Sequence, residues 1–134
     1  MMSTAPHRIV TYARFSSDRQ NPRSCEDQNA SFDRYLAMQG VDSRHVVRLH
    51  DDGMTGRVAS GRDGFEALRR LVAEGGVDVV LVEDVGRLSR DYVDAAQFFG
   101  ECSDRNVRII GIADGVDSAA PQGMMSYGLR ALFA

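Results

Sequence analysis

Apolar residues fall into four short runs of strand length, and segments with helical spacing separate them. The runs cover residues 9–12, 46–49, 77–82 and 107–113. Three of them are followed closely by polar residues or glycine, as the ends of strands require. Strands that alternate with helices form a parallel sheet with helices packed against it. The pattern therefore predicts a three-layer αβα domain with a mainly parallel sheet of four to five strands.

Helix signals lie between these runs. Ser24 and Asp27 have the spacing of a capping box, and apolar residues then recur on one face as far as Gly40, a plausible helix stop. Asp63 and Glu66 have the same spacing ahead of a second apolar stripe. We therefore expect one helix to follow each of the first two strands.

Two further helices are expected toward the end of the chain. Asp91 opens the first of them, and Pro121 suits the first turn of the other. The last helix is strongly apolar and still in mid-pattern at Ala134. We expect residues 1–134 to form one domain whose last helix is truncated or needs a partner.

Composition narrows the chemistry that is available. All 16 basic residues are arginines, which excludes reactions that need a lysine amine, such as Schiff-base chemistry or a P-loop. The two cysteines and three histidines lack the spacing of a metal site or a disulfide scaffold. No apolar run approaches the ~18 residues of a membrane span, and no signal peptide is recognisable. We therefore expect a cytoplasmic protein without a metal ion or a membrane contact.

Arginines collect where a site would form. Functional sites of open α/β sheets lie at the carboxyl ends of the strands. The segments after the first three strand runs contain Ser16 and six arginines: Arg14, Arg19, Arg57, Arg62, Arg87 and Arg90. Guanidinium groups bind phosphate oxygens in pairs and offset the charge that develops in phosphoryl transfer. The net charge of −3 argues against a surface coated in positive charge, but it allows such a local cluster.

Each signal also has an ordinary structural interpretation. A serine after a strand is often a cap or turn residue. Arg87 and Arg90 also suit a solvated helix start, and Asp51 and Asp52 could form a turn. Only the convergence of these residues at one edge of the sheet favours a catalytic site.

Three blocks of the sequence resemble the serine recombinases of the resolvase/invertase family. The first block is residues 12–17 followed by Gln20, the second is 52–56 with 62–65, and the third is 87–91. Their order and spacing fit the family across roughly residues 8–118. Residues 24–28 further resemble the segment found in large members such as phage integrases and transposition recombinases.

The resemblance implies a resolvase-like catalytic domain of a site-specific DNA recombinase, with self-association as a dimer and a tetramer in the active synapse. Ser16 would attack a DNA phosphodiester and form a 5′-phosphoserine intermediate. No ATP or other cofactor would be needed, because the covalent link conserves the bond energy. Around Ser16, the resemblance implies phosphate binding by four arginines, positioning of the serine or phosphate by an amide, and orientation of an arginine by an aspartate: Arg14, Arg62, Arg87, Arg90, Gln20 and Asp52.

The sequence departs from the family pattern in two respects. The position before Arg87 is usually an aspartate and is Gly86 here, while Asp84 lies two residues too early to be a simple replacement. From the sequence we expect Gly86→Asp to preserve or raise activity. Family members also continue into a longer helix and a DNA-binding region, which we expect this chain to lack.

Two other functions remain open at this point. A non-catalytic resolvase-like binding or assembly module is the main alternative, because Gly86 could mark a degenerate site. A receiver-like phosphoacceptor domain shares the alternating pattern, but such domains need a lysine beside the phosphoryl group.

Overall fold

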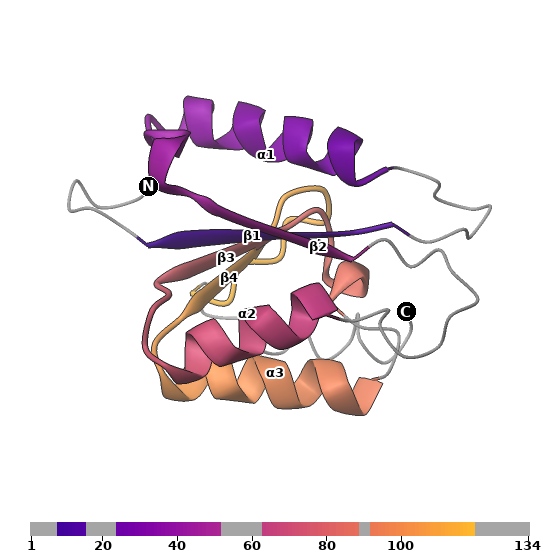
Figure 1. Cartoon of the computed structure of the whole chain (residues 1–134), viewed down its shortest axis with the longest axis vertical. Helices are drawn as coiled ribbons and strands as arrows, with labels where there is room; N and C mark the ends of the chain where they lie inside the picture. Colours follow the sequence, from indigo (N-terminus) through magenta and orange to yellow (C-terminus); the bar gives the residue numbers. More distant parts are fainter. Residues whose placement is uncertain (1–7, 16–23, 52–62, 89–91, 120–134) are drawn as a thin grey trace.

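A four-stranded parallel sheet forms the centre of the molecule (Figure 1). The computed structural model describes residues 8–15, 24–51, 63–88 and 92–119. The strand order is β2-β1-β3-β4, with every neighbouring pair parallel. The strands are β1 (Ile9–Arg14), β2 (Val47–Asp51), β3 (Val79–Val82) and β4 (Arg108–Gly111). The expectation of a mainly parallel sheet of four to five strands is confirmed, and the four carboxyl ends meet at one edge.

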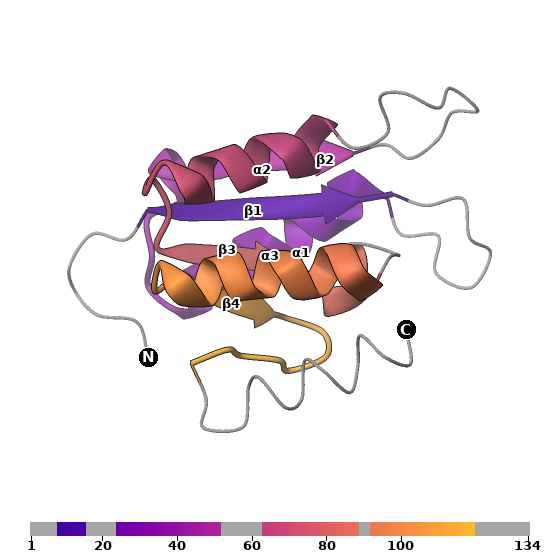
Figure 2. The ribbon, with the colours of Figure 1, turned by 90° about the horizontal axis from the view of Figure 1, so that it is seen from below.

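Helices cover both faces of the sheet. Helix α1 (Cys25–Met38) lies on one face, and α2 (Asp63–Ala73) and α3 (Tyr92–Asp104) lie side by side on the other (Figure 1). Seen from below, α2 runs along the β1–β2 half of the sheet and α3 along the β3–β4 half (Figure 2). This arrangement is the predicted three-layer αβα architecture. Two short 3-10 turns, η1 (Ser43–His45) and η2 (Val85–Arg87), complete the described elements.

The two faces of the sheet bury separate apolar clusters. On β1, Val10 and Tyr12 point into the cluster under α2 and α3, whereas Ile9 and Ala13 join the cluster under α1. Successive side chains of a strand point to opposite faces, so a strand covered on both sides must be apolar throughout. Burial on both faces therefore explains the apolar runs of β1, β3 and β4, whereas β2 at the sheet edge is mostly exposed.

Helix ends follow the predicted signals with one difference. Ser24 and Asp27 form the capping box ahead of α1, and Gly40 takes a left-handed conformation just after this helix. Asp63, by contrast, lies inside α2 as its first residue. The Gly64 and Phe65 amides of α2 donate to the Asp51 side chain of β2. This tertiary contact takes the place of the predicted second capping box. The expected start at Asp91 and the expected last helix lie outside the described residues.

The chain after β4 returns along the outer edge of that strand. An isolated antiparallel bridge joins Ile110 to Asp117, and the guanidinium of Arg108 donates two hydrogen bonds of 2.9 and 2.6 Å to the Asp117 carboxylate. This contact holds the pKa of Asp117 below its ordinary value. The pKa of nearby Tyr35 is raised, mainly by burial. The returning segment thus gives the edge of β4 both backbone and ionic partners.

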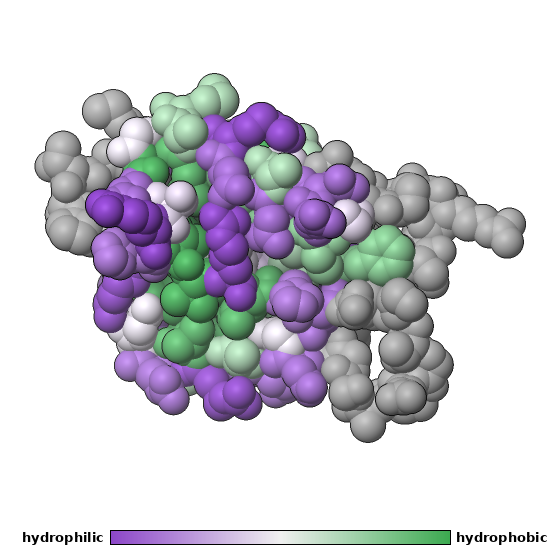
Figure 3. Space-filling model, turned by 45° about the horizontal axis from the view of Figure 1, so that its top comes forward, coloured by the Kyte–Doolittle hydropathy of each residue, from purple (hydrophilic) through white to green (hydrophobic). Residues whose placement is uncertain are grey.

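The opposite edge of the sheet, formed by β2, is partly exposed. Figure 3 shows an apolar strip between hydrophilic residues on the side where β2 forms the edge, and Val47 of this strand is 44% exposed.

None of the helices in the described ranges has the length and apolarity that a bilayer crossing requires.

Candidate active site

The carboxyl end of β1 is held by hydrogen bonds to α1 and β2. The Arg14 amide donates to Oε1 of Gln28 over 3.2 Å, and Nε2 of Gln28 donates to the Arg14 carbonyl over 3.0 Å. The next amide, that of Phe15, donates to the Asp51 carbonyl on β2 over 3.0 Å. Gln28 is fully buried, and its side-chain amide pairs with the Arg14 backbone as the backbone of a neighbouring strand would. The backbone is therefore fixed immediately before residue 16.

Arg14 and Arg87 hold each other through their backbone carbonyls. Arg14 donates from Nε to the Arg87 carbonyl over 3.1 Å and from Nη2 to the Gly86 carbonyl over 2.7 Å. In return, Nη1 of Arg87 donates to the Arg14 carbonyl over 2.9 Å. Since β1 and β3 are hydrogen-bonded neighbours, the two arginines meet across their carboxyl ends. The structure thus brings together two of the predicted phosphate-binding residues.

Arg87 is a buried cation whose Nη2 group has no hydrogen-bond acceptor in the part of the chain that the structure describes. The residue is only 5% exposed. Glu83 Oε1 lies 3.7 Å from Nη2, and Asp84 Oδ2 lies 3.8 Å from Nε. A buried guanidinium is costly unless counter-charges stand near it, and these two carboxylates supply them. The N–H groups of Nη2 are suited to an anionic oxygen.

Asp51 is the main residue at this edge that sequence reasoning did not identify. Its carboxylate accepts hydrogen bonds from the Tyr12 hydroxyl over 2.6 Å, the Gly64 amide over 2.7 Å and the Phe65 amide over 2.9 Å. The side chain of β2 therefore caps the N-terminus of α2 and ties it to β1. The sequence signal was the Asp51–Asp52 pair, and the end of β2 decides which of them faces α2.

Gly64 makes this close approach of α2 possible. A Cβ atom at position 64 would clash with the backbone carbonyl of His50 and lie 3.1 Å from Oδ1 of Asp51. Only a residue without a side chain lets the helix start so close to the end of β2.

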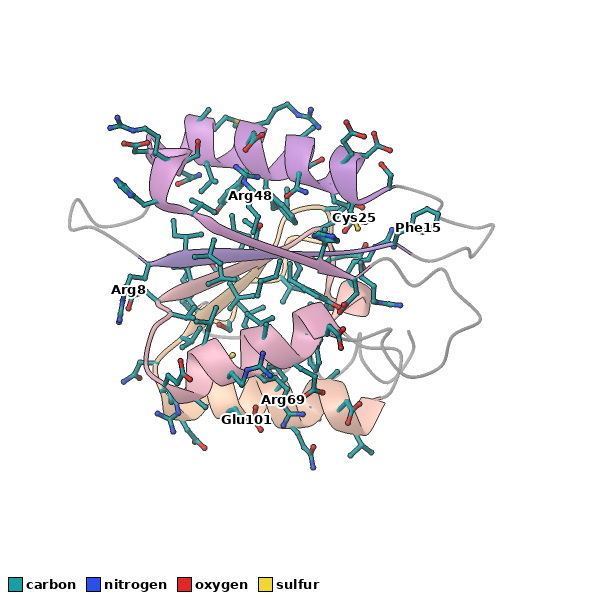
Figure 4. All side chains as sticks on the ribbon, in the orientation of Figure 1. Arg8, Phe15, Cys25, Arg48, Arg69 and Glu101 are labelled. Atoms are coloured by element: carbon teal, nitrogen blue, oxygen red, sulfur yellow. The ribbon has the colours of Figure 1, made fainter. Side chains whose placement is uncertain are left out.

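The other predicted site residues lie outside the described residues: Ser16, Gln20, Asp52, Arg62 and Arg90. Phe15 and Cys25 mark the edge from which the first of these segments leaves and to which it returns (Figure 4). Within the described ranges, no group of three His, Cys, Asp or Glu residues could hold a metal ion.

Arg69 and Cys102 lie away from this edge. Arg69 bridges α2 and α3 by donating to Glu101 over 3.2 and 2.6 Å (Figure 4). Burial raises the pKa of the Cys102 thiol to about 12, so this thiol stays protonated. Neither side chain has a described contact with the Arg14–Arg87 pair.

Fold and site together define a parallel α/β domain with two interlocked arginines at the carboxyl edge of its sheet. Comparison with known proteins places this arrangement in a family. The chain matches the family model "Resolvase, N terminal domain" over residues 9–134 and belongs to this family. A curated relative from Sinorhizobium fredii, "Uncharacterized protein y4bA/y4pH", is 38% identical over 86 residues, which are 62% of this chain. The chain spans about an eighth of that relative, 12% of its length.

Solved structures have the same fold. The N-terminal catalytic domain of TP901-1 integrase has a TM-score of 0.73 at 19% identity, with 94% of this chain and 92% of that chain covered. A resolvase family site-specific recombinase from Streptococcus pneumoniae has a TM-score of 0.75 at 24% identity, with coverages of 96% and 87%. The C-terminal catalytic domain of ISC1926 TnpA, an IS607-like serine recombinase, has a TM-score of 0.55 at 28% identity, with coverages of 89% and 75%. The expected resolvase-like fold is confirmed.

Proposed function

We propose that this chain is the catalytic domain of a site-specific serine recombinase that cleaves and rejoins DNA through Ser16. One observation supports this proposal above the others. Arg14, two residues before Ser16, interlocks with Arg87, and the buried Nη2 of Arg87 makes no hydrogen bond to any described residue. Such an arrangement suits a phosphodiester whose charge rises in the transition state.

In the proposed reaction, the Ser16 hydroxyl oxygen attacks a DNA phosphorus atom. The bond from phosphorus to the serine oxygen forms, and the bond from phosphorus to the 3′ oxygen breaks. The proton of the serine hydroxyl ends on the released 3′-hydroxyl, and the phosphate stays on the serine as a 5′-phosphoserine. Attack by a 3′-hydroxyl reverses these steps and rejoins the strands, so neither ATP nor a metal cofactor is required for the bond balance.

Each arginine has a role in this proposal. Nη2 of Arg87 donates to a non-bridging oxygen of the scissile phosphate, and Arg14 holds the loop that carries Arg87. Arg62 and Arg90 complete the phosphate site, Gln20 positions the serine or the phosphate, and Asp52 orients an arginine. These last roles come from the family resemblance, as do DNA as the substrate and assembly as a dimer and a tetramer.

Covalent trapping tests the proposal. The full-length protein that contains this sequence is incubated with its recombination site carrying a nick that lets the cleaved end diffuse away. We expect a protein–DNA adduct that maps to Ser16 by mass spectrometry, and we expect Ser16→Ala to abolish it. Ser17→Ala is the matched control, since it removes the adjacent hydroxyl. If the wild-type protein binds the site but forms no adduct, the non-catalytic assembly module becomes the better interpretation.

A further inference from the structure

The carboxylate of Asp84 occupies the space beside Gly86. A Cβ atom at position 86 would lie 3.0 Å from Oδ1 of Asp84. The 3-10 turn η2 causes this contact: the Arg87 amide donates to the Asp84 carbonyl over 3.0 Å and folds residue 84 back over residue 86. Asp84 stands two residues before position 86 in the sequence, which argued against a replacement. In the folded chain its carboxylate nevertheless lies beside position 86.

The Asp84 carboxylate has acceptors to spare. Asp84 is the N-cap residue of η2, yet its side chain makes no capping hydrogen bond. Its Oδ2 faces Arg87 Nε at 3.8 Å, and the side chain is 27% exposed, whereas that of Glu83 is 6% exposed. Of the two carboxylates next to Arg87, Asp84 is thus the one that opens toward the surface.

Each of the three nitrogens of the Arg87 guanidinium has a different neighbour. Nη1 donates to the Arg14 carbonyl, Oδ2 of Asp84 lies 3.8 Å from Nε, and Oε1 of Glu83 lies 3.7 Å from Nη2, which makes no hydrogen bond to a described residue. A planar guanidinium turns as one unit, so a charge beside one nitrogen also affects the direction of the other two. The Asp84 contact therefore contributes to the direction in which Nη2 points.

We propose that Asp84 is a positioning residue for Arg87, and that its carboxylate takes the place of a side chain at position 86. This proposal rests on the proposed function, because Arg87 is taken to bind the scissile phosphate. Asp84 itself contacts neither the phosphate nor Ser16 in this proposal.

The geometry also changes the expected effect of Gly86→Asp. A second carboxylate at position 86 would enter the space that Asp84 already fills, and two like charges in one site repel each other. The single variant should therefore lose activity, contrary to the expectation from the sequence alone. When Asp84 is removed, the same substitution should restore the lost carboxylate.

A double-mutant cycle tests this proposal in the full-length protein. The measured quantity is the single-turnover rate constant for the Ser16 adduct in Asp84→Ala, Gly86→Asp and the double variant. We expect Asp84→Ala and Gly86→Asp each to lower the rate constant about tenfold, and the double variant to recover to within about threefold of wild type. Asp104→Ala, which removes an exposed carboxylate at the end of α3, should leave the rate constant unchanged. Losses that simply multiply in the double variant, or a wild-type rate in Asp84→Ala, would overturn the proposal.

A second measurement does not depend on DNA. Nitrogen-15 NMR relaxation of the Arg87 Nε–H group should show a lower order parameter in Asp84→Ala and a recovered one in the double variant. An unchanged order parameter in Asp84→Ala would overturn the positioning role even if all variants fold normally. If the wild-type protein forms no adduct while the order parameter follows this pattern, the proposed function fails and the Asp84–Arg87 contact stands.

Discussion

The ends of β2 and β3 both place aspartate side chains at the carboxyl edge of the sheet, but their surroundings differ. Asp51 is 5% exposed and accepts three hydrogen bonds, from Tyr12, Gly64 and Phe65. Asp84 has a side chain that is 27% exposed, and among the described residues the ionic contact of its carboxylate is with Arg87 at 3.8 Å. A carboxylate with its partners supplied by the fold stabilises the fold. The Asp84 carboxylate, which lies beside Arg87 and caps no helix, is available to orient that arginine at the proposed site.

This difference predicts that removing the Asp51 carboxylate destabilises the fold strongly and that removing the Asp84 carboxylate hardly does. Asp51→Ala would leave two helix amides and a buried hydroxyl without their acceptor, so we expect a loss of about 4 kcal/mol in the free energy of unfolding. Asp84→Ala breaks no hydrogen bond and should change it by less than about 0.5 kcal/mol. Urea denaturation followed by circular dichroism measures both. Similar losses in the two variants would remove the distinction between them.

For activity, we expect arginines at the proposed site to matter more than an arginine that joins two helices. Arg87→Ala removes the proposed donor to the scissile phosphate and should slow adduct formation about a hundredfold, equivalent to ~3 kcal/mol. We expect a comparable loss for Arg90→Ala. Arg69→Ala is the matched control, because Arg69 pairs with Glu101 between α2 and α3, and it should have almost no effect on cleavage. Equal losses from all three variants would contradict the clustering of function at the sheet edge.

A smaller change tests the contribution of one donor to Asp51. Tyr12→Phe keeps the buried ring, which packs at 5.8 Å from the Phe65 ring, and removes the 2.6 Å hydrogen bond to the carboxylate. We expect a loss of about 1 kcal/mol in the free energy of unfolding. Tyr35→Phe on α1 is the control and should stay within about 0.5 kcal/mol of wild type. An equal or larger loss in the control would show that removal of a tyrosine hydroxyl is costly without a contact to Asp51.

The smallest expected effect concerns pH and the Arg108–Asp117 pair. The pKa of Asp117 is lowered in the folded protein, so its contribution to stability is present above the ordinary aspartate pKa and is lost as the pH falls through the lowered value. Wild-type protein should therefore lose about 0.5 kcal/mol more than Asp117→Asn between roughly pH 5 and pH 2. Thermal unfolding over this range measures the difference. Parallel pH curves would show that the pair contributes nothing.

Most elements were predictable because burial on two faces makes β1, β3 and β4 apolar and because helix ends have local signals. Ser24 and Asp27 cap α1 from within five residues of the helix start. The Asp51 cap was not predictable in the same way, because it joins β2 to a helix that begins twelve residues later. A slip of one residue in β2 would turn Asp52 instead of Asp51 toward α2, and no local pattern fixes that register.

The same reason applies to the site. The loops that hold Arg14 and Arg87 could be chosen from the sequence, since parallel strands end at one edge. Their interlocking depends on backbone carbonyls, which leave no trace in residue types. The contact between Asp84 and Gly86 depends on the 3-10 turn η2, which only the folded backbone reveals.

The hydrogen bonds that hold the end of β1 have a consequence for Ser16, the proposed nucleophile. Gln28 and Asp51 fix the backbone at Arg14 and Phe15, and Ser16 follows directly in the sequence. Two residues of extended chain span at most about 7 Å, so the Ser16 Cα is tethered within that radius of the Arg14 Cα. One hydroxyl confined to such a sphere corresponds to an effective concentration on the order of 1 M. In the proposed reaction, this tether would turn the encounter between Ser16 and an arginine-bound phosphate into a local search.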